Sequence, residues 1–377
     1  MRGARWRLSG QVQQSMKAEL LKRLALLSCS TLFALGLGEA YLRWNPPRWL
    51  YFETRNIVQQ DFSEPGPGGS LPYLPEANAE GRFRNREFDT HIRINSQGMR
   101  ADRDYSYSRS AETKRIVAVG DSFVFGWGVE VRETAISLLE QDLAPGVEVL
   151  NLGVSGYSAN ITWERLRYDG ILFHPDLVLF FVSQFPWVAN ESYAFVDGRL
   201  YWNDDIPRNW QQKAVSFARH HCYLFSFLRE APSRVRERSP SRSPVELQRS
   251  PFLPETAEVK AGLGLLEQLQ VLGRSKGFTP IVVLVPEKED VEAVLNVDGV
   301  RGETKKLREY CNSRQLGLVD LTLPLRDFWR REGKCPYFDL DDHWNVEGHR
   351  VAASAIATFL HERGFFPGRG REASTHD

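Results

Sequence analysis

The spacing of hydrophobic positions changes near residue 115, where short apolar runs begin to alternate with longer stretches of mixed polarity. Runs rich in Val, Ile and Leu that are apolar at nearly every position indicate strands buried on both faces, as in a parallel sheet. The predicted strands are Ile116–Val119, Val147–Leu152, Leu177–Val182, Pro280–Val285 and Leu316–Leu321. The predicted helices cover about 132–143, 159–172, 257–275, 301–314 and 346–363. This alternation predicts an α/β fold with a three-layer, doubly wound parallel sheet of five strands.

The segments around this pattern divide the chain further. Residues 1–42 form a tail and an apolar segment, and residues 43–113 form a lead-in with a short strand at Thr90–Asn95. The main domain is expected at 114–186 and 256–366, followed by a disordered tail at 367–377. An insertion at 187–255, after the third strand, opens with aromatic residues and closes with an Arg/Ser/Pro run. We interpret the run as a flexible solvated loop, whereas the aromatic residues either cap a site or pack the insertion onto the sheet.

The apolar segment near the N-terminus has the charge asymmetry of a signal anchor. Residues 24–38 are uncharged and follow Lys17, Lys22 and Arg23. Extended to Leu42, the segment reaches about the length that a tilted bilayer helix needs. We therefore expect an uncleaved membrane anchor with the main domain outside the cytoplasm, although cleavage after Ala40 is an alternative.

Composition excludes some partners and cofactors. The chain has 48 Lys and Arg residues against 48 Asp and Glu residues, so no net field draws it to nucleic acid. Of the four cysteines, one lies in the apolar segment, and the others form no CxxC or mixed Cys/His spacing. The sequence therefore predicts no metal and no cofactor, and the thiols are expected to be buried or free.

Two short segments far apart in the sequence carry candidate chemistry. Ser122 follows the first predicted strand in a Gly-Asp-Ser turn, which presents its hydroxyl at the carboxyl end of the sheet. His343 lies near the other end of the chain, directly after Asp341 and Asp342. A serine, a histidine and an acid are the parts of a hydroxyl nucleophile activated by an oriented imidazole, which suggests acyl transfer or ester hydrolysis.

Several motifs resemble the SGNH (GDSL-type) hydrolase superfamily. They are Gly120-Asp121-Ser122, the block from Asn151 to Gly156, and Asp341-Asp342-His343 with Asn345, Gly348 and His349. The segments Asn95–Arg100 and Phe123–Val129 resemble, more narrowly, the bacterial membrane-anchored members. The resemblance covers about 115–365 without the insertion, together with the lead-in near 90–100. It implies a flavodoxin-like sheet and serine-based acyl chemistry.

The resemblance also implies roles for single residues. Ser122 would be the nucleophile, and its own backbone N–H would face the developing oxyanion. His343 would be the general base and then the general acid. Asp341 stands where members of this type carry the orienting acid, and Asp342 and Asp339 are the fallbacks. Asn345 is expected to cap the last helix, and His349 to lie outside the chemistry.

The oxyanion hole is where the sequence departs from the resemblance. Gly156 matches the second-block glycine, although it could serve only the turn. The third block reads Val182-Ser183-Gln184-Phe185, so Gln184 replaces the expected asparagine donor. Losing one such donor costs on the order of 3 kcal/mol of transition-state stabilisation, so Gln184, or Asn190 from the following loop, must supply it for efficient catalysis.

Three functions remain open on the sequence alone. The first is a serine-dependent esterase or deacetylase that removes O-acyl groups from an extracytoplasmic carbohydrate or other envelope substrate. The second is an O-acyltransferase with the same three residues, because an acyl-serine is resolved by whichever acceptor the pocket admits. The third is an inactive carbohydrate-binding or assembly module, suggested by Gln184 and Phe185.

Overall fold

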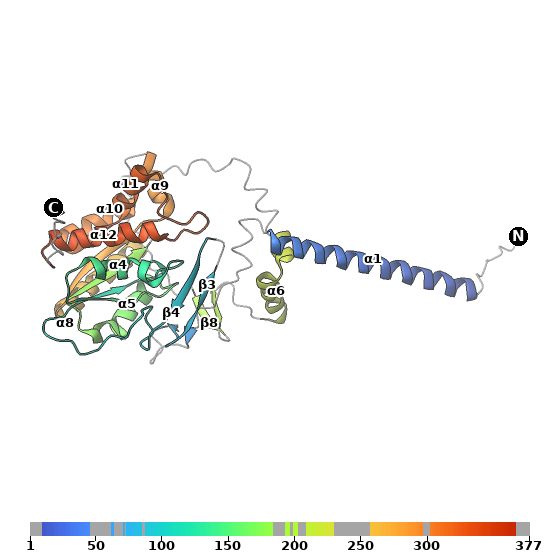
Figure 1. The fold of residues 1–377 in the computed structure, drawn as a ribbon, viewed down its shortest axis with the longest axis horizontal. Coiled ribbons are helices and arrows are strands. Elements are labelled where there is room, and N and C mark those ends of the chain that lie inside the picture. The colour runs from blue at the N-terminus through green and yellow to red at the C-terminus, as the bar shows by residue number, and fades with distance from the viewer. Residues whose placement is uncertain are drawn as a thin grey trace, which may run out of the picture. The chain divides into compact units, whose positions relative to one another are not determined.

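The computed structural model describes residues 10–45, 62–63, 71, 73–84, 87–183, 193–196, 199–202, 209–229, 257–296 and 302–366 (Figure 1). Two compact units emerge from the contacts within the chain. The first consists of Met1–Arg55 with Pro207–Ser241, and the second of Asn56–Ile206 with Arg242–Asp377. The second unit contains the sheet and all candidate catalytic residues.

The centre of the second unit is a five-stranded sheet in the order β11-β10-β7-β5-β6, in which every neighbouring pair is parallel. Its strands are β5 (Lys114–Val119), β6 (Val147–Asn151), β7 (Leu177–Ser183), β10 (Thr279–Val285) and β11 (Gly317–Asp320). The chain winds first from β5 to β6 and then back across β5 to β7, so the direction reverses between β5 and β7. The predicted flavodoxin-like α/β fold is confirmed, and the switch point at which such folds bind their ligands is at the carboxyl ends of β5 and β7.

Helices cover both faces of this sheet, as Figure 1 shows. One face packs on α4 (Ala135–Asp142), α9 (Lys288–Asn296), α11 (Thr322–Glu332) and α12 (Val346–Glu362). The other packs on α5 (Ala159–Tyr168), α8 (Ala257–Lys276) and α10 (Gly302–Ser313). Alternate residues of each strand serve the two cores. Ile116 and Ala118 of β5 belong to the first, whereas Val117 and Val119 belong to the second. Burial on both faces is the reason why these strands are apolar throughout.

Within the described residues of the second unit, α9 and α11 are helices of more than two turns that the hydrophobic pattern did not predict. Helix α9 opens with a charged stretch from Lys288 to Asp290, and α11 carries Pro324 in its first turn, where proline is tolerated. Among the described side chains, Val291 is the buried apolar residue of α9 and Leu325 that of α11. Two predicted helices are shorter α-helices joined to 3₁₀ turns, η1 (Val131–Glu133) before α4 and η2 (Gly170–Phe173) after α5.

The lead-in forms two small antiparallel pairs. Strands β1 (Phe62–Ser63) and β2 (Leu74–Pro75) pair with each other, and so do β3 (Glu80–Arg84) and β4 (Asp89–Arg93). The second pair includes most of the short strand predicted at Thr90–Asn95. Phe83, Phe88 and Ile92 form a buried cluster with Phe125, which follows the candidate nucleophile by three positions. The lead-in therefore packs against the segment that carries Ser122.

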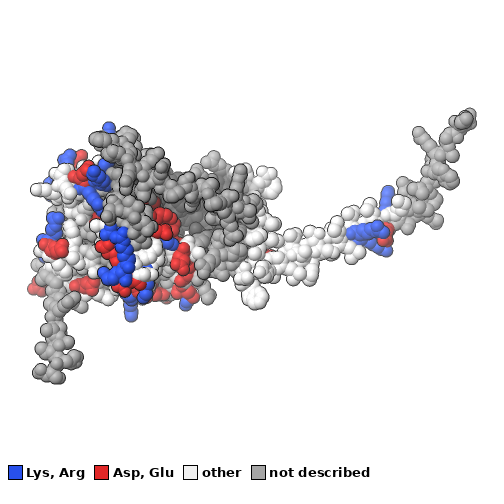
Figure 2. All heavy atoms as spheres, turned by 90° about the horizontal axis from the view of Figure 1, so that it is seen from above, with Lys and Arg blue, Asp and Glu red and all other residues white. Residues whose placement is uncertain are grey.

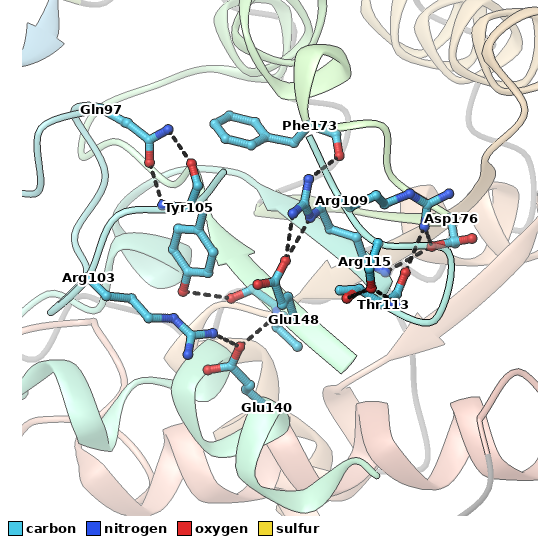
Figure 3. Close-up of polar contacts among 12 residues, drawn as sticks. Gln97, Arg103, Tyr105, Arg109, Thr113, Arg115, Glu140, Glu148, Phe173 and Asp176 are labelled. Atoms are coloured by element: carbon cyan, nitrogen blue, oxygen red, sulfur yellow. Dashed lines mark hydrogen bonds and ion pairs between the residues drawn. The ribbon is translucent and has the colours of Figure 1, made fainter. Parts of the chain in front are cut away.

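A polar network ties the lead-in to the amino-terminal edge of the sheet (Figure 3). Arg115 at the start of β5 is almost fully buried and donates to Glu148 Oε2 at 2.7 Å and to the Phe173 carbonyl at 2.7 Å. Asp176 accepts hydrogen bonds from the Arg115 backbone N–H at 2.8 Å and from Arg109. These contacts lower the pKa of Asp176, although its partial burial alone would raise it. The network lies at the edge opposite to Ser122 and has a structural role.

The first unit contains a long N-terminal helix, α1 (Gly10–Trp44). Its part from Met16 to Trp44 is long and apolar enough to cross a membrane, by length and composition. Figure 2 shows most of α1 free of charged side chains, with basic residues near its N-terminal end. The same unit contains α6 (Trp210–His221) and a helical segment at 223–229. The rest of the predicted insertion comprises β8 (Tyr193–Val196), paired with β9 (Arg199–Trp202), and residues outside the described part of the chain.

Candidate active site

Ser122 begins helix α3 (Ser122–Phe125) directly after β5, at the carboxyl edge of the sheet. Asp121 caps this helix by accepting a hydrogen bond from the Phe123 N–H at 3.0 Å. Close packing with β6 fixes the short helix. Asn151 donates to the Val124 carbonyl at 2.8 Å, and a Cβ on Gly153 would lie 2.4 Å from the Phe125 nitrogen. Only glycine at 153 allows this approach, so the second sequence block positions the candidate nucleophile.

His343 lies against Ser122, although 221 positions separate them in the sequence. The Ser122 Oγ is 2.6 Å from His343 Nε2, within hydrogen-bond distance. The segment that carries His343 is held by an isolated bridge between Tyr337 and Trp344 and by a hydrogen bond from the Phe338 N–H to the His343 carbonyl at 3.0 Å. A histidine in contact with a serine hydroxyl can accept its proton.

Asp341 contacts the other nitrogen of the same ring. Its Oδ1 pairs with His343 Nδ1 and accepts the His343 backbone N–H at 2.9 Å. Burial would raise the pKa of Asp341, but the hydrogen bonds and charge of His343 outweigh burial and lower this pKa below its ordinary value. Asp342 and Asp339, the two alternatives considered from sequence, are both exposed. Of these carboxylates, Asp341 therefore has the geometry of the orienting acid.

Trp127 was not assigned a role from sequence, and it contacts both Asp341 and His343. Its indole Nε1–H donates to Asp341 Oδ2 at 3.1 Å. The Trp127 ring stacks on the imidazole with centroids 5.2 Å apart and an interplanar angle of 26°. Phe123 also contacts the imidazole, at 5.0 Å between centroids. The two oxygens of Asp341 thus have different partners, and aromatic faces adjoin the ring that would carry positive charge during catalysis.

Arg100 holds the loop that carries Trp127. Its buried guanidinium donates to the carbonyls of Phe125, Gly126 and Val129. Burial lowers the pKa of Arg100 to about 10, so the group remains charged at neutral pH. Asn95 orders the preceding turn by accepting the N–H of Met99 at 2.9 Å. The lead-in motif from Asn95 to Arg100 therefore supports the candidate site through the loop after Ser122.

Asp121 joins the two strands at the point where the winding direction reverses. Ser183, at the end of β7, donates its hydroxyl to Asp121 Oδ2. Burial of the carboxyl group raises the pKa of Asp121, while the hydrogen bonds from Ser183 and Phe123 oppose this effect. This arrangement agrees with a role for Asp121 in organising the turn. It also fixes the end of β7 beside Ser122.

Of the predicted oxyanion donors, the structure describes Ser122 and Gly156 but not Gln184 or Asn190. Gly156 lies in the turn after β6 with a φ of 84°, a conformation that favours glycine, so the turn alone accounts for its presence. Gln184 and Asn190 both lie outside the described residues, which end at Ser183 and resume at Tyr193. Their predicted roles therefore stay predictions, as does that of the Ser122 N–H.

The two remaining residues near His343 have structural contacts. Asn345 caps α12 by accepting the N–H groups of Glu347 and Gly348 at 3.0 and 3.2 Å. The His349 Nδ1 accepts the Ala135 N–H at 3.1 Å, and burial lowers the pKa of His349 to about 3. His349 is therefore neutral and packs inside the domain. In the described part of the chain, no group of three or more His, Cys, Asp or Glu side chains is arranged to hold a metal ion.

Replacing Trp127 by phenylalanine is expected to lower kcat for ester hydrolysis by about 10- to 100-fold with little change in KM, because a hydrogen bond to a charged group is lost. The remaining ring still covers the imidazole, so the loss reports the missing indole donor. Steady-state kinetics of the two proteins measure it. Trp163→Phe is the matched control, since Trp163 is a buried tryptophan of α5 in the core on the other face of the sheet. Equal kcat values in Trp127→Phe and the wild type would contradict a positioning role.

The fold and these contacts define the class of protein. A parallel α/β sheet with a serine, a histidine and an aspartate joined in this order at its carboxyl edge is the arrangement of a serine hydrolase. A sequence model of one family, described as the SGNH hydrolase-like domain of acetyltransferase AlgX, matches residues 247–376, which include Asp341 and His343. Residues 247–376 therefore match an SGNH hydrolase-like domain, the class of ester-bond hydrolase that the motifs predicted.

Comparisons with individual proteins add likenesses at low identity. A member of the lipolytic G-D-S-L family from Veillonella parvula is 14% identical, with a TM-score of 0.37, covering 65% of this chain and 97% of its own. The acetyl xylan esterase AlAXEase is 12% identical, with a TM-score of 0.39, covering 65% and 98%. A variant of Axe2, an acetyl-xylooligosaccharide esterase from Geobacillus Stearmophilus, is 16% identical, with a TM-score of 0.39, covering 68% and 97%. At these scores the likenesses carry no part of the assignment. No curated protein matches the sequence.

Proposed function

We propose that this protein is a serine-dependent esterase that removes O-acyl groups, with Ser122 as nucleophile, His343 as general base and acid, and Asp341 as orienting acid. The observation that carries the proposal is the continuous contact from the Ser122 hydroxyl through His343 to Asp341, with 2.6 Å between Ser122 Oγ and His343 Nε2. This contact speaks against an inactive binding module, because such a module needs no proton path between the three residues.

The contacts suggest the following sequence of steps. Ser122 Oγ attacks the carbonyl carbon of the ester while its proton moves to His343 Nε2. Asp341 stabilises the resulting imidazolium, and backbone or amide donors stabilise the oxyanion of the tetrahedral intermediate. Collapse of this intermediate breaks the bond to the alcohol, which takes the proton from His343. Water then attacks the acyl-serine with His343 as base, which releases the acid and restores Ser122.

The description of the matching family and the N-terminal helix together support a proposal for the substrate class. We assign the enzyme to short acyl esters, above all O-acetyl groups, of a carbohydrate or other envelope molecule. The supporting observations are the acetyltransferase in the description of the matching family and an apolar helix suited to anchoring the domain outside the cytoplasm. In this proposal the partners are the ester substrate and the membrane.

Acyl transfer is the second candidate function. The family description names an acetyltransferase, and the same acyl-serine can be resolved by a glycan hydroxyl in place of water. The two functions share every step up to the acyl-serine. They differ only in the group that reaches the intermediate.

A direct test uses the full chain purified in detergent. The protein should hydrolyse an activated acetyl ester, and a fluorophosphonate should label Ser122, located by mass spectrometry of the digested protein. Adding an acetylatable oligosaccharide separates the two functions, because a transferase forms acetylated sugar at the expense of free acetate. Absence of both acetate release and Ser122 labelling would contradict the proposal.

Gln184 provides a test of the oxyanion hole. If its amide is a donor, Gln184→Ala should lower kcat by about 100-fold while KM changes little, because the interaction forms mainly in the transition state. Gln184→Asn should keep or improve turnover, since the shorter side chain has one rotatable bond fewer. The measurement is steady-state hydrolysis of the same ester by the three proteins. Wild-type kinetics in Gln184→Ala would mean that Asn190 or backbone amides complete the hole.

A further inference from the structure

The first unit contains an unusual contact between α1 and the insertion. Glu39, near the C-terminal end of the apolar helix, accepts the backbone N–H of Tyr223 at 3.1 Å and that of Leu224 at 2.7 Å. The Cys222 Sγ approaches the same carboxylate at 3.3 Å. These N–H groups belong to the first turn of the helical segment 223–229, so Glu39 acts as its N-terminal cap from a distant part of the sequence.

Apolar packing reinforces this polar contact. Leu42 and Tyr223 are both buried and form a small cluster with Leu224 and Phe227. Arg43 lies over the Tyr223 ring at 5.5 Å and donates to Glu39 at 2.7 Å. A carboxylate within the last turns of a membrane helix is costly unless it has partners, and Glu39 has them from two segments. The segment 223–229 is therefore held at one end of the candidate membrane span.

Helix α6 directly precedes this segment and leaves large apolar side chains exposed. Trp210 and Phe217, seven positions apart and thus on one face of the helix, are 75% and 62% exposed. Gln212 lies on the other side of the helix. Leu228 in the following segment is 60% exposed. Exposure of this size also occurs along α1, for example at Leu27, where lipid is the natural environment.

We propose that α6 and the segment 223–229 lie in the membrane–water interface beside the end of α1, with Trp210, Phe217 and Leu228 in the lipid. The proposal rests on the membrane anchoring proposed above. Its partner is a bilayer surface because the contacts of Glu39 and Leu42 hold these helices at the end of the span, where the interface lies. Tryptophan is enriched at that depth, and amphipathic helices bury their apolar face about 5–10 Å into the headgroup region.

Site-specific photocrosslinking of the full chain in vesicles of phosphatidylethanolamine and phosphatidylglycerol tests the proposal. The photoreactive residue p-benzoylphenylalanine replaces Phe217, Gln212 or Leu27 in three separate variants, and mass spectrometry identifies the crosslinked product. We expect lipid adducts at positions 27 and 217 and none at position 212. The ester hydrolysis of each preparation is measured in parallel.

Each outcome has a distinct meaning. Lipid adducts at 27 with crosslinks from 217 only to protein, whether within the chain or to a second copy, would overturn the inference and leave the anchoring intact. No lipid adduct at 27 would remove the anchoring and the inference together. Neither result bears on the esterase proposal, which the parallel activity measurement tests alone.

A variant of Glu39 tests the contact that holds the helices. In vesicles, Glu39→Ala should speed hydrogen exchange at the amides of Tyr223 and Leu224 by roughly fivefold, because the cap is lost. Glu39→Gln keeps a side-chain acceptor and should change exchange less. Unchanged exchange in Glu39→Ala would contradict the role of Glu39 as a cap.

Discussion

Replacing Ser122 by alanine is expected to lower kcat for acetyl-ester hydrolysis on the order of 10⁴- to 10⁶-fold. The reason is that the hydroxyl is the only atom at position 122 able to form the acyl intermediate. The substitution removes one partly buried oxygen at the end of β5 and leaves the hydrogen bond between the Asp121 side chain and Phe123 in place. Unfolding by denaturant should therefore show nearly unchanged stability.

The matched test of this prediction is the double variant Ser122→Ala with His343→Ala. Because the two residues act as a unit, the double variant should lose no more activity than Ser122→Ala alone. Multiplicative losses would indicate that His343 acts independently of Ser122. Substantial activity in Ser122→Ala would place the nucleophile elsewhere and end the proposed mechanism.

Replacing Asp341 by asparagine should cost about 10³- to 10⁴-fold in kcat, less than the loss of the nucleophile. An asparagine has one acceptor and one donor where the carboxylate has two acceptors. Oδ1 faces the N–H groups of His343, and Oδ2 faces the indole N–H of Trp127. In either orientation of the asparagine amide, its NH₂ group faces another donor, either the N–H groups of His343 or the indole N–H of Trp127. The imidazole then loses its defined tautomer.

The same geometry supplies the controls. Asp342→Asn changes an exposed carboxylate next in sequence and should leave kcat near the wild-type value. In Trp127→Phe the opposing indole donor is gone, so adding Asp341→Asn should cost less there than in the wild type. A large loss in Asp342→Asn with little loss in Asp341→Asn would show that the other carboxylate orients His343.

The sequence predicted the sheet because its strands are buried on both faces, and such strands are apolar without interruption. Helices α9 and α11 were not predicted, because charged residues fill four of nine positions in α9 and five of eleven in α11 and interrupt the apolar pattern. The pairing of Ser122 with His343 was expected only from their types and their order along the chain. Their contact requires the fold to bring the end of β5 next to the segment before α12, and no local sequence pattern encodes this tertiary arrangement.

The supporting residues were harder to predict than the three central ones. Trp127 and Arg100 both lie in motifs that the sequence analysis names, but neither motif reveals that an indole would meet Asp341 or that a guanidinium would bind backbone carbonyls of the loop after Ser122. Such contacts need the tertiary arrangement of the lead-in and the loop after α3. A Trp after the glycine of the nucleophile loop, together with a buried Arg upstream, is the pattern that could have suggested them.

The contact between Glu39 and the segment 223–229 affects how proteolysis could release the hydrolase domain from α1. The hydrolase domain is connected to α1 once through the backbone after Trp44. The insertion provides a second, non-covalent connection, because its segment 223–229 binds α1 through hydrogen bonds and apolar contacts. A protease that cuts only between Trp44 and β1 therefore leaves the domain tethered. With α1 as the proposed membrane anchor, release of the domain would require either a second cut in the insertion or the withdrawal of Tyr223 and Leu224 from the Glu39 carboxylate.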